Sequence, residues 1–230
     1  MDSMDEPNGR SNEAVSSVSM PSDVAARASA RARALRLEYL TVGYNIVEGL
    51  VAVTVATAAG SVALLGFGVD SFIESLSGAI LVWRLRAENR SSTSAAIHSL
   101  DRKAERWVGV SFFVLAAYIA WEAAESLIEG RRPEITWIGI GLTVVSIAIM
   151  WWLGAAKRRV ARELGSRALE ADAFQTTVCW WLSLITLGGV SLNAMFGWWW
   201  ADPVSALGMT ALLLREGREA WKGQTCGSCR

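Results

Sequence analysis

The chain alternates between long apolar blocks and short charged segments, and this alternation restricts the folds that it can adopt. A helix needs roughly 20 apolar residues to cross the ~30 Å hydrocarbon layer of a bilayer. Six blocks approach or reach that length, so the pattern predicts an all-α membrane protein, a bundle of six transmembrane helices. The expected spans lie at about residues 37–57, 61–83, 107–128, 135–153, 168–187 and 200–214, the last being the shortest.

The basic residues are sorted between the two ends of these spans. All but two of the 22 Lys and Arg residues fall in the two terminal segments and in the connections after the second and fourth spans. The exceptions are Arg131 and Arg132, between the third and fourth spans. Because Lys and Arg concentrate on the cytoplasmic side of a membrane, both termini are expected to be cytoplasmic. A soluble helical bundle would not sort the charges of its loops in this way.

Composition divides the chain into three parts. Residues 1–30 are polar and contain no aromatic residue, so we expect a disordered N-terminal tail. Residues 31–222 form the expected six-helix transmembrane domain. Residues 223–230 form a short C-terminal tail in which Cys226 and Cys229 make a CxxC pair. This pair either hands on metal or senses redox state, or it consists of two reduced thiols without a special role.

Several classes of function find no support in the sequence. The formal net charge of zero gives no indication of nucleic-acid binding. The single histidine, His98, falls in a charged cytoplasmic connection, and there is no HExxH motif, phosphate loop or nucleophile–base pair. We therefore expect neither an enzyme nor a prosthetic cofactor.

Two acidic residues near the middle of the second expected span are the leading candidates for a functional site. Asp70 and Glu74, in GFGVDSFIES, are four residues apart and therefore share one helix face. An ionisable group inside a span is costly and by default suggests a function. Two neighbouring carboxylates in hydrocarbon repel each other unless a proton or a cation lies between them. The pair therefore either binds a divalent metal ion or is a structural pair bonded to Ser, Asn or Tyr.

The fifth expected span carries a matching polar set in EADAFQTTVCWW. Asp172, Gln175 and Cys179 follow the spacing i, i+3, i+7 and therefore share a face. If the second and fifth spans pack together, Gln175 and Cys179 meet Asp70 and Glu74 at similar depth. Asp172 then lies one turn nearer the cytoplasm, at the mouth of the pathway.

Other spans also carry polar residues. Asn45 and Glu48 share a face of the first span and are expected to line the pathway. Glu122 and Glu125 of the third span either face an outer vestibule or pair with the two arginines that follow it. Asp202, followed by Pro203, is predicted to be the N-cap of the sixth helix. Small residues stud the second span and predict a central helix that packs closely on several partners.

Three segments resemble spans of the cation diffusion facilitators. SVALLGFGVDSFIES is similar to the second span of that family, which has an Asp-x-x-x-Asp pair after a Ser-x-Ala-Leu stretch. ALEADAFQTTVCWWLS is similar to the fifth span, where Ala-Asp-Ala-x-His-x-x-x-Asp is usual. ADPVSALGMTALLLREGREAW resembles the sixth, and the resemblance covers about residues 35–222.

The resemblance implies proton-coupled export of zinc or a related divalent ion, usually by a homodimer. The metal-binding residues that it implies are Asp70, Glu74, Gln175 and Cys179. Glu74 and Cys179 each replace a usual Asp, and Gln175 replaces a usual His. The thiol makes the site softer and favours zinc, cadmium or iron(II) over magnesium. Members usually carry a soluble cytoplasmic domain after the sixth span, so a short form lacking that domain is expected here.

Together these features predict a divalent cation efflux transporter, with zinc as the expected ion, in a bacterial plasma membrane. Metal enters from the cytoplasm past Asp172 and loses water to Asp70, Glu74 and Cys179. Protons from the opposite side then compete for these ligands, because metal ligands must be deprotonated. The alternatives are a membrane metal sensor or partner subunit that does not transport, and a transporter of another substrate such as an organic cation.

Overall fold

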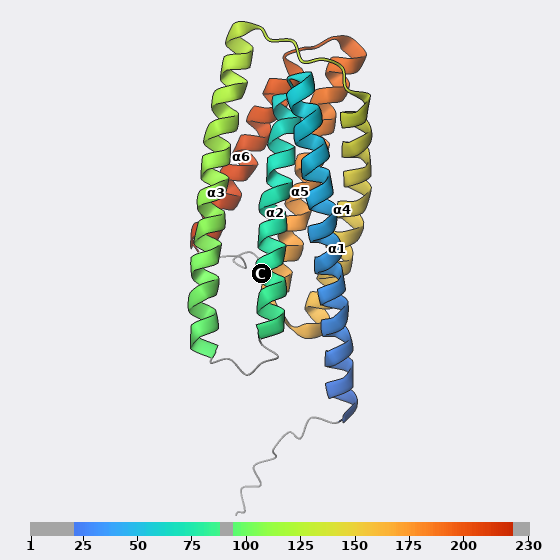
Figure 1. Cartoon of the computed structure of the whole chain (residues 1–230), viewed down its shortest axis with the longest axis vertical. Coiled ribbons are helices and arrows are strands. Elements are labelled where there is room, and N and C mark those ends of the chain that lie inside the picture. The colour runs from blue at the N-terminus through green and yellow to red at the C-terminus, as the bar shows by residue number, and fades with distance from the viewer. Residues whose placement is uncertain (1–20, 88–93, 223–230) are drawn as a thin grey trace, which may run out of the picture.

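The computed structural model describes residues 21–87 and 94–222, and this part of the chain forms six α-helices. Successive helices run in opposite directions, so the α1–α2, α3–α4 and α5–α6 connections lie at one end of the bundle (Figure 1). The all-α bundle that the sequence predicts is therefore confirmed. The helices are α1 (Pro21–Ala59), α2 (Val62–Ala87), α3 (Ser94–Glu129), α4 (Trp137–Leu164), α5 (Arg167–Phe196) and α6 (Ala201–Lys222).

Four of these helices contain segments that are long and apolar enough to cross a membrane. The segments are Ala25–Ala59, Val62–Arg86, Trp137–Leu164 and Ala168–Phe196, in α1, α2, α4 and α5. Among the described residues, α3 and α6 do not meet the same criterion. The six-span count and the cytoplasmic position of both termini therefore stay predictions.

The distribution of side chains is that of an integral membrane protein. Large apolar residues cover the outside of the bundle: Ile128, Trp137 and Met195 are 86%, 73% and 74% exposed. Water would disfavour so much exposed apolar surface, whereas lipid tails accept it. Many Ser, Thr, Asp and Glu side chains are instead buried between the helices. Polar groups inside and apolar groups outside fit a bundle surrounded by lipid.

The helices extend well beyond the predicted spans. Helix α1 begins at Pro21, so residues 21–30, assigned to the tail by composition, are helical. Helix α4 continues to Leu164, and Gly165 ends it in the left-handed conformation with φ 60° before Ser166 caps α5. The predicted edges depend on hydrocarbon thickness, which limits the apolar length of a helix and not its total length. Residues 1–20 and the tail with Cys226 and Cys229 lie outside the described residues.

Helix α2 is central, as its small residues indicate. It packs against α1, α3, α5 and α6, and most extensively against α1. At Gly68 the two helices are so close that a Cβ atom would lie 2.9 Å from both Cβ of Ala52 and Cγ2 of Val53. Small residues at such a contact allow helix backbones to approach within a bilayer, where lipid supplies no hydrophobic force.

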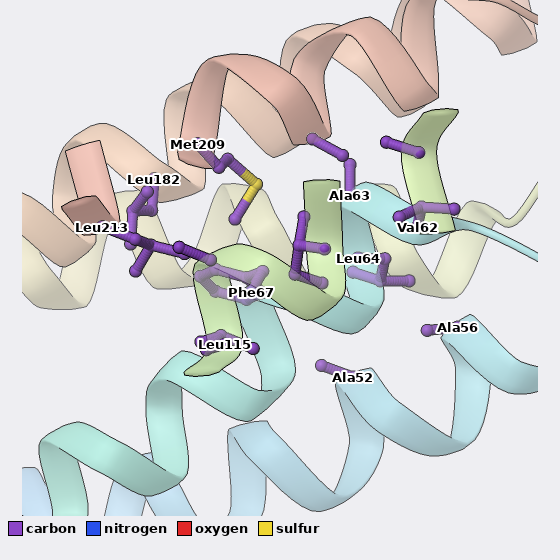
Figure 2. Packing of buried hydrophobic residues seen from close by; sticks show 14 of the residues in the cluster. Ala52, Ala56, Val62, Ala63, Leu64, Phe67, Leu115, Leu182, Met209 and Leu213 are labelled. Atoms are coloured by element: carbon purple, nitrogen blue, oxygen red, sulfur yellow. The ribbon is translucent and has the colours of Figure 1, made fainter. Parts of the chain in front are cut away.

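The described residues form three clusters of buried apolar side chains, and the two with the most members enclose the middle of the bundle. In the larger one, Phe67 of α2 packs among Leu115 of α3, Leu182 of α5, and Met209 and Leu213 of α6 (Figure 2). This cluster extends toward the α1–α2 connection. The smaller cluster lies toward the other end, between α1, α2, α4 and α5, and contains Ala34, Leu81, Leu85, Val160, Ala161 and Leu169. Along α2, the polar residues of interest lie between Phe67 of the larger cluster and Leu81 of the smaller one.

Candidate functional site

A layer of buried polar side chains crosses the bundle between the two apolar clusters. Helices α1, α2 and α5 contribute to this polar layer. Each of its members is at most 5% exposed, so the layer is closed to solvent in this conformation. The members are Asn45, Glu48, Asp70, Ser71, Glu74, Thr176 and Cys179.

Two direct contacts join α2 to α5 within the layer. The thiol of Cys179 donates to Oδ2 of Asp70 at 3.0 Å. The hydroxyl of Thr176 donates to Oε1 of Glu74 at 2.9 Å. The two helices are antiparallel, so Asp70, which precedes Glu74 in α2, meets Cys179, which follows Thr176 in α5. The structure thus brings Asp70, Glu74 and Cys179 to the same part of the bundle.

Gln175 lies beside this group and does not contact either carboxylate through a hydrogen bond given by the structure. Its Oε1 accepts from the hydroxyl of Ser77 at 3.0 Å, one turn along α2 from Glu74. The neighbouring Thr176 takes the place opposite Glu74. By spacing alone, either residue 175 or residue 176 could face Glu74 on the side of α5 that carries Asp172 and Cys179. The rotation of α5 about its axis places Thr176 there.

Helix α1 completes the polar layer on another side. Oε1 of Glu48 accepts from the hydroxyl of Tyr44 at 2.8 Å, and Oε2 accepts from Ser71 at 3.0 Å. Because Glu48 faces Ser71 on an antiparallel helix, Asn45 lies about one turn away, near the level of Glu74. Asn45 and Glu48, the predicted pathway residues, therefore both belong to the layer.

Several atoms of the layer have no hydrogen-bond partner among the described residues. They include Oε2 of Glu74 and both Oδ1 and Nδ2 of Asn45. Leaving a buried polar atom unpaired costs about 1–3 kcal/mol, so such atoms call for a ligand, a proton or water. The layer therefore offers carboxylate, amide and thiol donors to a bound cation.

The donors are not gathered around one point in this conformation. Among the described residues, no group of three or more His, Cys, Asp or Glu side chains is arranged to hold a metal ion. Asp70 instead accepts a hydrogen bond from Cys179, and Glu74 accepts one from Thr176. A metal ion would have to replace these hydrogen bonds and draw the side chains together.

Lys157 is a buried residue that the charge pattern of the sequence places in a cytoplasmic connection. It lies within α4, and its side chain is fully buried. Its ammonium group donates to Oε2 of Glu38 at 3.2 Å and pairs with the carboxylate of Asp172. Asp172, predicted at the pathway mouth, is therefore 5% exposed and ion-paired. The sequence does hold one signal for this contact. Glu38 and Asp172 both fall at the predicted cytoplasmic ends of their spans, and Lys157 falls just beyond the predicted cytoplasmic end of the fourth span.

Two further predictions meet clear outcomes. Arg131 pairs with Glu122 at 2.8 Å and with Glu125 at 3.0 Å, so for this arginine the pairing alternative is confirmed.

Asp202 does not act as the predicted N-cap of its own helix. It lies in the first turn of α6, and its carboxylate accepts from the backbone N–H of Val62 at 2.8 Å, which caps α2 instead.

The comparisons with known proteins agree with this architecture. The cation efflux transmembrane domain matches residues 39–223, a range that contains the whole polar layer. The chain is 29% identical over 150 residues to transmembrane protein 163 of Xenopus laevis, covering 64% of this chain and 51% of that protein. It is 31% identical over 156 residues to an uncharacterized transporter of Synechocystis sp., covering 65% and 49% of the two chains.

A third relative is an uncharacterized transporter of Methanocaldococcus jannaschii. It is 22% identical over 180 residues, covering 77% of this chain and 63% of that protein. The chain thus spans about half of the first two relatives and less than two thirds of the third. The family match extends over most of the helices described above. The chain belongs to the cation efflux family.

Proposed function

We propose that this chain carries a divalent metal ion, with zinc as its substrate, across the membrane in exchange for protons. Family membership supports the class of activity. The observation that carries the proposal is the meeting of Asp70 and Glu74 of α2 with Cys179 of α5 in a buried layer. Ionisable groups inside a membrane bundle usually serve a transport pathway.

The donor set favours a borderline or soft divalent ion. Asp70 and Glu74 supply oxygen, and the Cys179 thiol supplies sulfur once it has lost its proton. Zinc accepts this mixture, whereas magnesium prefers oxygen ligands alone and keeps its water. Asn45 lies near the level of Glu74 and can add an amide oxygen. Gln175, bonded to Ser77, lies one step along the route toward Asp172.

Proton exchange follows from the same donors. A metal ion binds carboxylate and thiolate, so loading the site releases protons. Protons that arrive from the opposite side compete for these ligands and release the metal. Glu48 is held by Tyr44 and Ser71, so its side chain keeps a fixed position beside the metal ligands. The homodimer and the bacterial plasma membrane implied by the resemblance stay predictions.

Flux through reconstituted protein tests the proposal. Liposomes containing the protein and a zinc-sensitive dye should take up zinc when a pH gradient is applied. The variant Asp70→Asn/Glu74→Gln keeps side-chain size but removes both charges, and its flux should fall more than about tenfold. The matched control is Glu122→Gln/Glu125→Gln, which removes two carboxylates outside the polar layer and should keep its flux.

The other outcomes are equally informative. Wild-type flux in Asp70→Asn/Glu74→Gln would refute the assignment of the site. Zinc flux that ignores the pH gradient would refute proton exchange. Zinc binding to purified protein without any flux would favour the metal sensor or partner subunit.

A further inference from the structure

The buried ion pairs of Lys157 form a second polar group next to the polar layer. Lys157 of α4 and Glu38 of α1 are 0% exposed, and Asp172 of α5 is 5% exposed. The ammonium group contacts both carboxylates. The three groups come from three helices. They lie toward the end of the bundle that is away from the α1–α2 connection, next to the smaller apolar cluster. We call this group the inner triad.

The inner triad contains two acidic groups and one basic group. One ammonium faces two carboxylates, and each carboxylate keeps a buried oxygen with no partner among the described residues: Oε1 of Glu38 and Oδ1 of Asp172. A buried ion pair needs only one carboxylate for each ammonium group, so the second acidic group is not explained by pairing alone. Two facing carboxylates with spare oxygens have the chemistry of a divalent cation site. The ammonium group of Lys157 supplies half of the charge that such an ion would bring.

The inner triad is linked to the polar layer through one hydroxyl group. Nζ of Lys157 lies 3.4 Å from Oγ1 of Thr176, and that hydroxyl donates to Oε1 of Glu74 at 2.9 Å. The ammonium therefore lies one side chain away from the Asp70–Glu74 pair. A lysine side chain is long and flexible, so its ammonium group can move toward Glu74 without a helix moving.

We propose that Glu38 and Asp172 form an inner position for the transported divalent ion, which the Lys157 ammonium fills while no metal is present. An arriving ion displaces the ammonium group toward Thr176 and Glu74. Lys157 is thus a tethered cation that competes with the substrate and pairs with the two acidic groups while no metal is bound. The inference deepens the proposed function and rests on it for the identity of the ion, but metal binding tests it separately.

Metal binding to purified protein is the first test, with the Asp70→Asn/Glu74→Gln variant as the background. In that background, zinc titration calorimetry should show one additional bound ion per chain when Lys157→Met is introduced. The matched control adds Glu38→Gln and Asp172→Asn to the same protein, retains every cysteine, and should lose the additional ion. No additional ion in a folded Lys157→Met protein would overturn the proposal.

A second variant covers the case in which Lys157→Met does not fold. Glu38→Gln/Lys157→Met/Asp172→Asn removes all three charges and leaves none unpaired. If the inner triad is a step on the ion route, zinc flux in liposomes should fall about tenfold although the protein folds. Wild-type flux in this variant would show that the inner triad only supports the structure.

The two proposals fail in distinguishable ways. Flux that survives Asp70→Asn/Glu74→Gln would refute the proposed site in the polar layer. The additional zinc ion in the Lys157→Met protein would still support the inner position in that case. Conversely, loss of flux in Asp70→Asn/Glu74→Gln with no additional ion would retain the transporter and refute the inner position.

Discussion

Asp202 shows how a single carboxylate can join helices that are far apart in the sequence. Its oxygens accept from the Ser61 hydroxyl at 2.5 Å and from the Val62 N–H at 2.8 Å, although Asp202 itself belongs to α6. Replacement by Ala would leave these buried donors unpaired, so we expect Asp202→Ala to lose about 1–3 kcal/mol of stability. Asp202→Asn keeps one acceptor oxygen and should lose less. Thermal unfolding in detergent measures both, and an Asp202→Ala protein as stable as wild type would contradict the assigned cap.

Helical spacing alone is enough to predict part of the candidate site. Four residues separate Asp70 from Glu74, and this spacing on a membrane helix identifies the pair as neighbours on one face. Cys179 follows from the same kind of spacing on the fifth span. The choice of Thr176 over Gln175 opposite Glu74 depends on how α5 is rotated, which spacing does not determine. Lys157 escapes prediction because a lysine near the end of a predicted span resembles a solvated loop residue until its buried partners are known.

At the scale of the helices, the contact between α1 and α2 depends on the absence of side chains at one point. A Cβ at Gly68 would lie 2.9 Å from the Cβ of Ala52, closer than such atoms normally approach. We therefore expect Gly68→Ala to destabilise the protein by about 1–3 kcal/mol through overpacking. Gly43→Ala is the matched control, since a Cβ there meets no atom within 4 Å.

The control variant should be neutral, or more stable by up to roughly 1 kcal/mol, because alanine favours helix over glycine. Thermal unfolding of the two purified variants in one detergent makes the comparison. Equal stability of Gly68→Ala and Gly43→Ala would contradict the close contact between α1 and α2.

Helix boundaries are harder to predict than the helices themselves. Apolar length identifies where hydrocarbon begins and ends, and it places a helix at each of the six expected positions. It does not report helical turns that continue beyond the apolar block, as α4 does from Leu153 to Leu164. Those additional turns carry Lys157, so the error in the boundary also hides the inner triad.

In the whole molecule, the helices that meet the membrane criterion also carry the candidate site. Helices α1, α2, α4 and α5 contain the four segments that meet the membrane criterion, and they also supply the polar layer and the inner triad. Helices α3 and α6 pack extensively on each other and contact α2 from another side. These four helices therefore combine an apolar exterior with a charged interior, which is the arrangement that a pathway through the bilayer needs.

The orientation of the molecule in the membrane can be predicted from the distribution of its Lys and Arg residues. Arg131 and Arg132, the two exceptions, lie in the α3–α4 connection, at the end of the bundle opposite the start of α1 (Figure 1). The connection should therefore face outward and both termini inward.

Single-cysteine labelling with a membrane-impermeant maleimide tests this orientation. In a Cys226→Ser/Cys229→Ser background, Arg132→Cys should react in intact cells, while buried Cys179 does not. In the same background, Ser11→Cys should react only after permeabilisation, as should the tail cysteines of the unchanged chain. Labelling of the two termini from opposite sides would mean an odd number of spans, and reaction of both termini in intact cells would reverse the orientation.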